Sequence, residues 1–146
     1  MQTKNQKALS SGIAVIVAML VAFGIQSYLK KLNDPTSLRI LNKIASEYNK
    51  SLPMMIDNET QLTSVSALDK EVIYYYKLVS LDSSDDLVSK ISQMKPRMIN
   101  HNCSTPDTRD NFLKKGITME YRYYDKSDKH LVDIDIFPSD CLQFSN

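Results

Sequence analysis

The fold is decided by residues 71–81, EVIYYYKLVSL, which carry the clearest strand pattern in the chain. Successive side chains of a strand point to opposite faces. One face collects Val72, Tyr74, Tyr76 and Leu78, and the other collects Ile73, Tyr75, Lys77 and Val79. Because both faces are largely apolar or aromatic, this strand is predicted to lie in the centre of a sheet.

Three more strands are predicted around this one. β-branched residues indicate a strand over 60–66, and alternating residues indicate strands over 117–124 and 130–137. Polar turns at 67–70 and 125–129 join the four strands into two hairpins. In the last strand, apolar residues alternate with Asp133 and Asp135, which is typical of a sheet face open to water.

Helices are predicted from apolar residues spaced three or four apart. One covers about residues 36–50, and a second follows the helix-start chemistry of Asp82-Ser83-Ser84 until Pro96 kinks or ends it. A short third helix is expected between Thr105 and Gly116. The apolar stripe of the second helix consists of Leu87, Ile91, Met94 and Met98. The predicted fold class is α+β, with an antiparallel sheet of about four strands and two or three helices on one face.

Residues 8–29 carry no charge and lie between Lys7 and Lys30. About 22 helical residues span roughly 33 Å, enough to cross a hydrocarbon core of about 30 Å. We interpret residues 1–31 as an N-terminal transmembrane anchor, 32–37 as a linker and 38–146 as an exported domain. A signal cleaved near Ala22-Phe23-Gly24 and a buried soluble helix are the alternatives.

Two widely spaced cysteines, Cys103 and Cys141, are predicted to form one disulfide, which requires an oxidising compartment. Two free buried thiols facing the cytoplasm are the alternative. The disulfide places the N-terminus inside and the domain outside. The predicted location is a single-pass inner-membrane protein with a periplasmic C-terminal domain, or a protein secreted to the periplasm after signal cleavage.

The charge distribution argues against nucleic-acid binding. Four of the 18 Lys and Arg flank the apolar segment, whereas all 17 Asp and Glu follow it, so the rest of the chain is mildly acidic. Nucleic-acid binders usually present a basic face.

No catalytic, metal or cofactor site is predicted. With three glycines in the chain there is little material for an oxyanion loop or a phosphate cradle. A zinc site built from the two cysteines with His101 and His130 lacks a zinc spacing, and oxidised cysteines cannot ligate. Asp133 and Asp135 lie about 7 Å apart on one strand face. That separation resembles glycosidase carboxylates, but a solvated strand face is the simpler interpretation.

Six of the eight tyrosines lie in the predicted strands. Four are expected to fill the core against the helices. Tyr75 and Tyr124 are expected on the opposite face with Arg122 nearby, and this candidate binding surface has the composition of a protein-binding patch. Ordinary cross-strand pairing is the alternative.

A set of residues along 52–141 carries a resemblance to known proteins: LPMMID at 52–57, Thr60, Leu62, Tyr74, Tyr76, Leu78, Val79, Cys103, Gly116, Ile117, Tyr121, Tyr123, Asp140 and Cys141. With these residues the chain resembles a group of small bacterial envelope proteins with an N-terminal signal or anchor. The resemblance covers about residues 50–146 and implies an exported α+β domain with one disulfide and no known activity. A remoter resemblance is to the disulfide-bearing pilotins of type II secretion, which are lipoproteins, whereas this chain has no cysteine near its N-terminus.

The sequence therefore predicts a membrane-anchored envelope protein whose periplasmic domain binds another envelope protein, without catalysis. An immunity protein or a pilotin-like secretion-accessory protein is one alternative. A small periplasmic enzyme or ligand carrier is the other, and a deep polar pocket containing His101, Asp133 or Asp135 would favour it.

Overall fold

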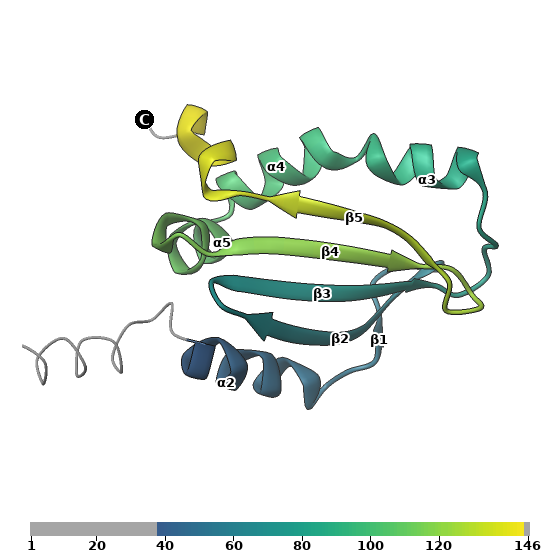
Figure 1. The fold of residues 1–146 in the computed structure, drawn as a ribbon, viewed down its shortest axis with the longest axis horizontal. Helices are drawn as coiled ribbons and strands as arrows, with labels where there is room; N and C mark the ends of the chain where they lie inside the picture. The colour runs from purple at the N-terminus through teal and green to yellow at the C-terminus, as the bar shows by residue number, and fades with distance from the viewer. Residues whose placement is uncertain (1–37, 145–146) are drawn as a thin grey trace, which may run out of the picture. The chain divides into compact units, whose positions relative to one another are not determined.

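A five-stranded sheet organises residues 38–144, which are the residues that the computed structural model describes (Figure 1). The strands lie side by side in chain order. β1 pairs with β2, β2 with β3 and β4 with β5 in antiparallel fashion, whereas β3 and β4 are parallel. The strand bounds are β1 Met54–Met55, β2 Thr60–Leu68, β3 Glu71–Leu78, β4 Thr118–Tyr124 and β5 His130–Ile136.

The α+β class and a mostly antiparallel sheet are confirmed, with one correction to the strand pairing. The two-residue β1 adds a fifth strand to the four predicted, and residues 38–144 hold four α-helices where two or three were predicted. The two central strands are parallel because the chain between them is a helical crossover that returns it to the end of the sheet where β3 began.

The helices begin and end where local chemistry predicts. The Ser84 hydroxyl accepts a hydrogen bond from the Leu87 N–H at 3.2 Å and caps α3. Pro96 lies in the first turn of α4, so it separates α3 from α4 rather than kinking one helix. Gly116, with φ of 79°, ends the helical stretch in the left-handed conformation. The helices are α2 Leu38–Asn49, α3 Asp85–Ser92, α4 Lys95–Ser104 and α5 Pro106–Asn111, with the 3-10 segments η1 Leu113–Lys115 and η2 Pro138–Phe144.

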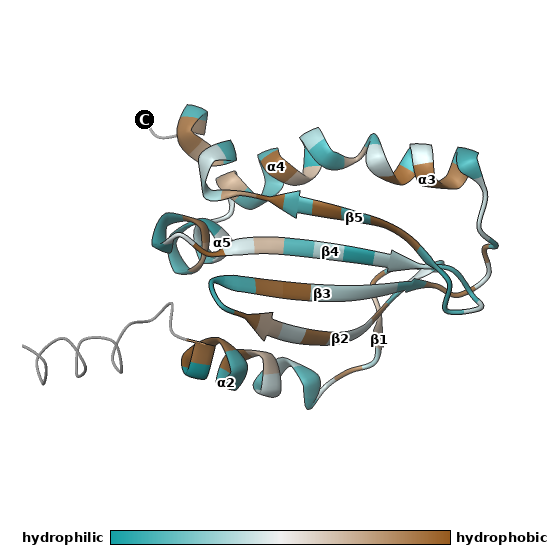
Figure 2. Ribbon diagram, viewed as in Figure 1, coloured by the Kyte–Doolittle hydropathy of each residue, from teal (hydrophilic) through white to brown (hydrophobic). Residues whose placement is uncertain are grey.

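The hydrophobic core lies on one face of the sheet, between the strands and the helices. Leu41 of α2, Met119 of β4 and Ile136 of β5 are almost fully buried there. Apolar and polar residues alternate along α2 and α3, as expected for helices that pack with one side (Figure 2). Burial of this apolar surface is the main stabilising contribution to the domain.

Helix α2 also closes the edge of the sheet. The side-chain amide of Asn49 donates to the Val65 carbonyl at 2.7 Å and accepts from the Val65 N–H at 2.8 Å. These are the bonds that a neighbouring strand would make, beyond the point where the two-residue β1 ends. The amide therefore satisfies an edge that would otherwise be open to pairing.

The predicted anchor (residues 8–29) and linker (32–37) lie outside the residues that the structure describes. Within residues 38–144, no helix combines the length and the apolar character needed to cross a bilayer.

Candidate functional site

Four tyrosines from the two central strands form one stacked row on the helix-bearing face. The parallel register places Tyr74 beside Tyr121 and Tyr76 beside Tyr123. Ring centroids lie 5.4 Å apart for Tyr74 and Tyr121, and 5.3 Å apart for Tyr76 and Tyr123, with interplanar angles of 14° and 19°. Tyr76 and Tyr121 stack diagonally at 6.1 Å and make the row continuous. Because β strands hold these rings at fixed spacing, the row is a rigid aromatic platform.

The tyrosine row is the floor of an open cleft. In Figure 1, α2 runs along the β2 side of the sheet, while α3 and α4 run along the β5 side. A cleft of about 630 Å³ lies over Tyr76, Tyr121 and Tyr123, between α3 and the connection from β1 to β2. A second hollow of about 410 Å³ shares Tyr76 and Tyr121 with it and continues along α4. We refer to the two together as the tyrosine cleft.

Apolar side chains form most of the cleft walls. Met94 is 41% exposed although it belongs to the apolar stripe of the helices. Methionine is flexible and polarisable, so it adapts to different apolar surfaces. The apolar stripe predicted from the sequence thus borders an opening in the structure. The apolar wall residues are Ile56, Leu78, Leu81, Leu87, Ile91, Met94 and Met98.

Three of the four floor hydroxyls have no partner within residues 38–144. Tyr121 donates to the Asn102 side-chain oxygen at 2.8 Å, whereas the hydroxyls of Tyr74, Tyr76 and Tyr123 make no hydrogen bond there. Tyr74 and Tyr123 are only 9% and 7% exposed. Buried hydroxyl groups normally find a partner. The cleft floor therefore presents polar groups that a bound molecule or water would satisfy.

Burial raises the pKa of every tyrosine in the row. It raises the pKa of Tyr123 to about 12, with the neighbouring Tyr76 adding to the effect. The pKa values of Tyr74, Tyr76 and Tyr121 also rise, mainly because burial disfavours the phenolate. All four hydroxyls are therefore protonated donors at neutral pH.

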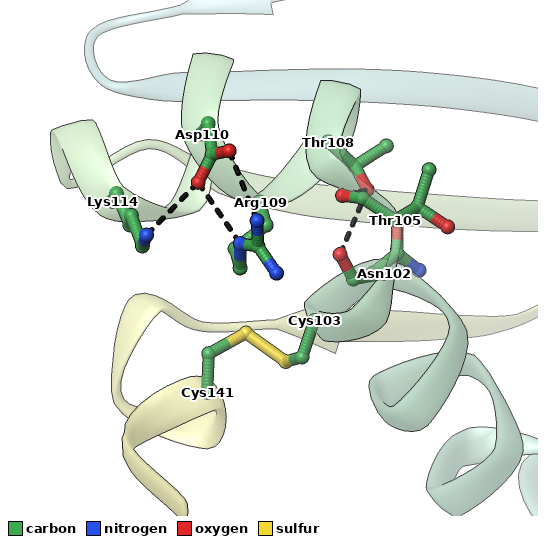
Figure 3. A network of polar contacts seen from close by, with 8 residues as sticks. All are labelled: Asn102, Cys103, Thr105, Thr108, Arg109, Asp110, Lys114 and Cys141. Atoms are coloured by element: carbon green, nitrogen blue, oxygen red, sulfur yellow. Dashed lines mark hydrogen bonds and ion pairs between the residues drawn. A yellow bond between two sulfur atoms is a disulfide. The ribbon is translucent and has the colours of Figure 1, made fainter. Parts of the chain in front are cut away.

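A disulfide fixes α4, the helix that borders the smaller part of the cleft. Cys103 of α4 is bonded to Cys141 of η2, with their Cα atoms 5.3 Å apart (Figure 3). The disulfide predicted from the sequence is therefore present, and the alternative of two free thiols is wrong. Next to it, Asp110 is ion-paired with Arg109 at 2.9 Å and Lys114 at 3.0 Å. Those two cations lower the pKa of Asp110 well below its ordinary value.

The predicted binding surface of Tyr75, Tyr124 and Arg122 lies on the opposite face of the sheet. The two rings are 6.4 Å apart, and the Arg122 guanidinium is 5.7 Å from the Tyr75 ring centroid. The three residues are thus neighbours, as predicted, and their role in binding stays a prediction. Arg122 also pairs with Glu120, and the Tyr75 hydroxyl lies 3.1 Å from the Ser66 hydroxyl.

Three carboxyl groups meet on that same open face. Oxygens of Glu71, Glu120 and Asp135 lie within 4.8 Å of one another. Burial and a hydrogen bond with Glu120 raise the pKa of Glu71, and burial raises the pKa of Asp135. Arg122 pairs with Glu120 and so places a cation beside this cluster.

The residues considered for zinc or acid catalysis do not form one site in residues 38–144. His101 lines the smaller part of the tyrosine cleft. His130 lies on the open face, where its Nε2 is 2.7 Å from Asp133. Asp133 and Asp135 are on that face too and do not line the tyrosine cleft, and the cysteines are bonded to each other.

No known family model and no curated protein sequence matches the chain. Solved structures do share its fold. A Pseudomonas aeruginosa protein inferred to be secreted is similar with a TM-score of 0.61 and 16% identity, covering 71% of this chain and 91% of that one.

Two pilotins share the fold as well. EpsS of the Vibrio vulnificus type 2 secretion system gives a TM-score of 0.57 and 10% identity, covering 71% of this chain and 90% of EpsS. AspS of the Vibrio cholerae type II secretion system gives 0.54 and 15%, covering 79% of this chain and 98% of AspS. At these identities the likeness establishes the fold, and the remoter resemblance seen in the sequence agrees with it.

Proposed function

We propose that this chain is a secretion-accessory protein that holds an apolar helix of a type II secretion-system protein in the tyrosine cleft. The observation that carries the proposal is the tyrosine row at the floor of an open apolar cleft, where three of the four hydroxyls have no hydrogen-bond partner within residues 38–144. The shared fold with two pilotins supplies the class of partner.

The dimensions of the cleft favour a helix. Neighbouring strands lie about 4.8 Å apart, so β3 and β4 together present a strip roughly 10 Å wide. A helix with its side chains is about 10–12 Å across. Figure 1 shows α2 along the β2 side of the sheet and α3 and α4 along the β5 side, and the larger part of the cleft lies over Tyr76, Tyr121 and Tyr123 of the strands between them. An amphipathic helix in a groove is a common mode of peptide recognition.

The membrane assignment belongs to the same proposal. We place residues 8–29 in the inner membrane and the domain in the periplasm, which suits a disulfide-bonded domain. The eight residues from 30 to 37 would then hold the domain close to the bilayer, within about 30 Å of it.

Site-specific photo-crosslinking in the cells that produce the chain tests the proposal. A photoreactive phenylalanine analogue at Met94, in the cleft, is expected to crosslink the full chain to a type II secretion-system protein. The same analogue at Ser127, on the exposed turn between β4 and β5, is the matched control and is expected to give no such product. Identical products from both positions, or none from Met94, would contradict the proposal.

A small apolar ligand is the second candidate occupant. The larger part of the cleft, about 630 Å³, lies within the usual range of ligand pockets, about 300–1,000 Å³. Native mass spectrometry of the full chain as purified distinguishes the two candidates. A ligand carrier is expected to retain a small bound mass that Met94→Glu removes.

A further inference from the structure

The tyrosine cleft carries opposite charges at its two ends. Arg97 and His101, one turn apart on α4, line the smaller part of the cleft. Asp57 and Glu59, in the connection from β1 to β2, line the larger part. The cleft is therefore apolar along its length, cationic at one end and anionic at the other.

The cationic end is not neutralised by the domain itself. Within residues 38–144, neither the Arg97 guanidinium nor the His101 ring is ion-paired with a carboxylate. By contrast, Lys90, which also lines the cleft, is paired with Asp86 at 2.6 Å. In the part of the chain that the structure describes, Arg97 thus has no ion-pair partner and lines the cleft beside its apolar floor.

The anionic end is held in place by the backbone. Asp57 accepts hydrogen bonds from the N–H groups of Glu59 and Thr60 at 2.8 and 2.7 Å. These bonds lower the pKa of Asp57, so it stays ionised at neutral pH. Glu59 accepts a hydrogen bond from the Ser80 hydroxyl, which fixes its position beside Asp57.

We infer, resting on the proposed function, that the bound helix has an acidic residue at the end that meets Arg97 and His101 and a basic residue at the end that meets Asp57 and Glu59. Complementary charges at the rim of an interface set the register of the partner and exclude partners with like charges. The apolar floor gives affinity, and the two charged ends select which helix binds and in which direction.

Model peptides with one common apolar face test this inference. The wall residues from Leu87 to His101 match a peptide of about 14 residues, roughly 21 Å long as a helix. One peptide carries Glu at one end and Lys at the other, a second carries Lys at both ends, and a third carries Glu at both. Binding to the full chain in phosphatidylcholine nanodiscs is measured by fluorescence anisotropy, with empty nanodiscs as the blank.

The Glu/Lys peptide is expected to bind most tightly. Arg97→Glu and Glu59→Lys are each expected to weaken its binding by about fivefold. The double variant Arg97→Glu/Glu59→Lys is expected to restore binding, because the peptide then docks end for end. Lys115→Glu, an exposed charge reversal outside the cleft, is the matched control and is expected to change nothing.

The outcomes separate this inference from the proposed function. If all three peptides bind equally and the charge reversals have no effect, the charge inference is wrong while docking in the cleft stands. Met94→Glu is expected to abolish binding of every peptide. If it does not, or if no peptide binds at all, helix docking in the cleft is wrong and the charge inference falls with it.

Discussion

The two faces of the sheet differ in whether their polar side chains have partners within residues 38–144. On the open face the polar side chains satisfy one another: Arg122 pairs with Glu120, His130 with Asp133 and Lys77 with Asp128. On the helix-bearing face, Tyr74 and Tyr123 are buried residues, and their hydroxyls have no partner within residues 38–144. Polar side chains that already pair with one another gain little from a partner protein. Hydroxyls without a partner in residues 38–144 can gain a hydrogen bond from one. The comparison teaches that two tyrosine-rich surfaces of one sheet can differ in how far their own side chains satisfy their polar groups.

The largest expected effect is the loss of stability when the disulfide that ties α4, at the wall of the cleft, is removed. The double variant Cys103→Ser/Cys141→Ser is expected to lower the free energy of unfolding by about 3–4 kcal/mol, because the closed loop spans 38 residues in sequence. Urea unfolding of the full chain, followed by circular dichroism, measures it. The variant is also expected to lose partner binding, since α4 would no longer be tied to η2. An unchanged urea midpoint would contradict this expectation.

Two tyrosines of the row are expected to differ clearly in what their hydroxyls contribute to the free energy of unfolding. Tyr121→Phe leaves the buried Asn102 oxygen without its donor, so it is expected to cost about 1–2 kcal/mol of unfolding free energy. Tyr123→Phe removes a hydroxyl that has no partner among residues 38–144, so it is expected to be neutral or slightly stabilising. The same urea titration compares the two, and each serves as the control for the other. Equal destabilisation would mean that the Tyr123 hydroxyl is satisfied in a way that residues 38–144 do not provide.

Substitution of Asn49, which closes the sheet edge at α2, is expected to destabilise the domain by a similar or smaller amount. Asn49→Ala removes both hydrogen bonds to Val65 and is expected to destabilise the domain by about 1–2 kcal/mol. Asn49→Asp is the matched variant: it keeps the acceptor for the Val65 N–H but places a carboxylate against the Val65 carbonyl. It is expected to be at least as destabilising as alanine. Both are measured by thermal unfolding, and a neutral Asn49→Ala would show that β2 does not need this edge bond.

Local structure was predictable from the sequence, but the long-range pairing and the cleft were not. The Ser84 cap, Pro96 and Gly116 act within a few residues, so they indicate helix boundaries without the rest of the fold. Strand pairing instead depends on the path of the chain between strands. From the sequence alone, the helical segment between β3 and β4 is compatible with parallel or antiparallel pairing of these strands. The pairing depends on the end of the sheet at which that segment leads into β4.

The cleft was missed for a related reason. A stripe such as Leu87, Ile91 and Met94 has the same spacing whether the helix is fully covered or borders an opening. The one local signal was the two methionines, Met94 and Met98, at the end of the stripe. By contrast, the common face of Tyr75 and Tyr124 follows from the two-residue period of a strand, which is a local property.

The smallest expected effect concerns the carboxyl cluster of the open face. Burial, the hydrogen bond with Glu120 and the nearby Asp135 raise the folded-state pKa of Glu71 above its unfolded value. The stabilisation from its proton is therefore complete below the unfolded pKa and is lost as pH rises through the folded pKa. Between pH 7 and about pH 5 the wild-type chain should gain stability from Glu71, by less than about 1 kcal/mol because the group is partly solvated.

Glu71→Gln is expected to remove this gain and to be slightly more stable than wild type at pH 7. Urea midpoints at the two pH values test this, with Glu47→Gln on the exposed side of α2 as control. If Glu71→Gln and Glu47→Gln shift the midpoint equally at both pH values, protonation of Glu71 does not stabilise the open face, and its contrast with the tyrosine cleft would rest on the ion pairs alone.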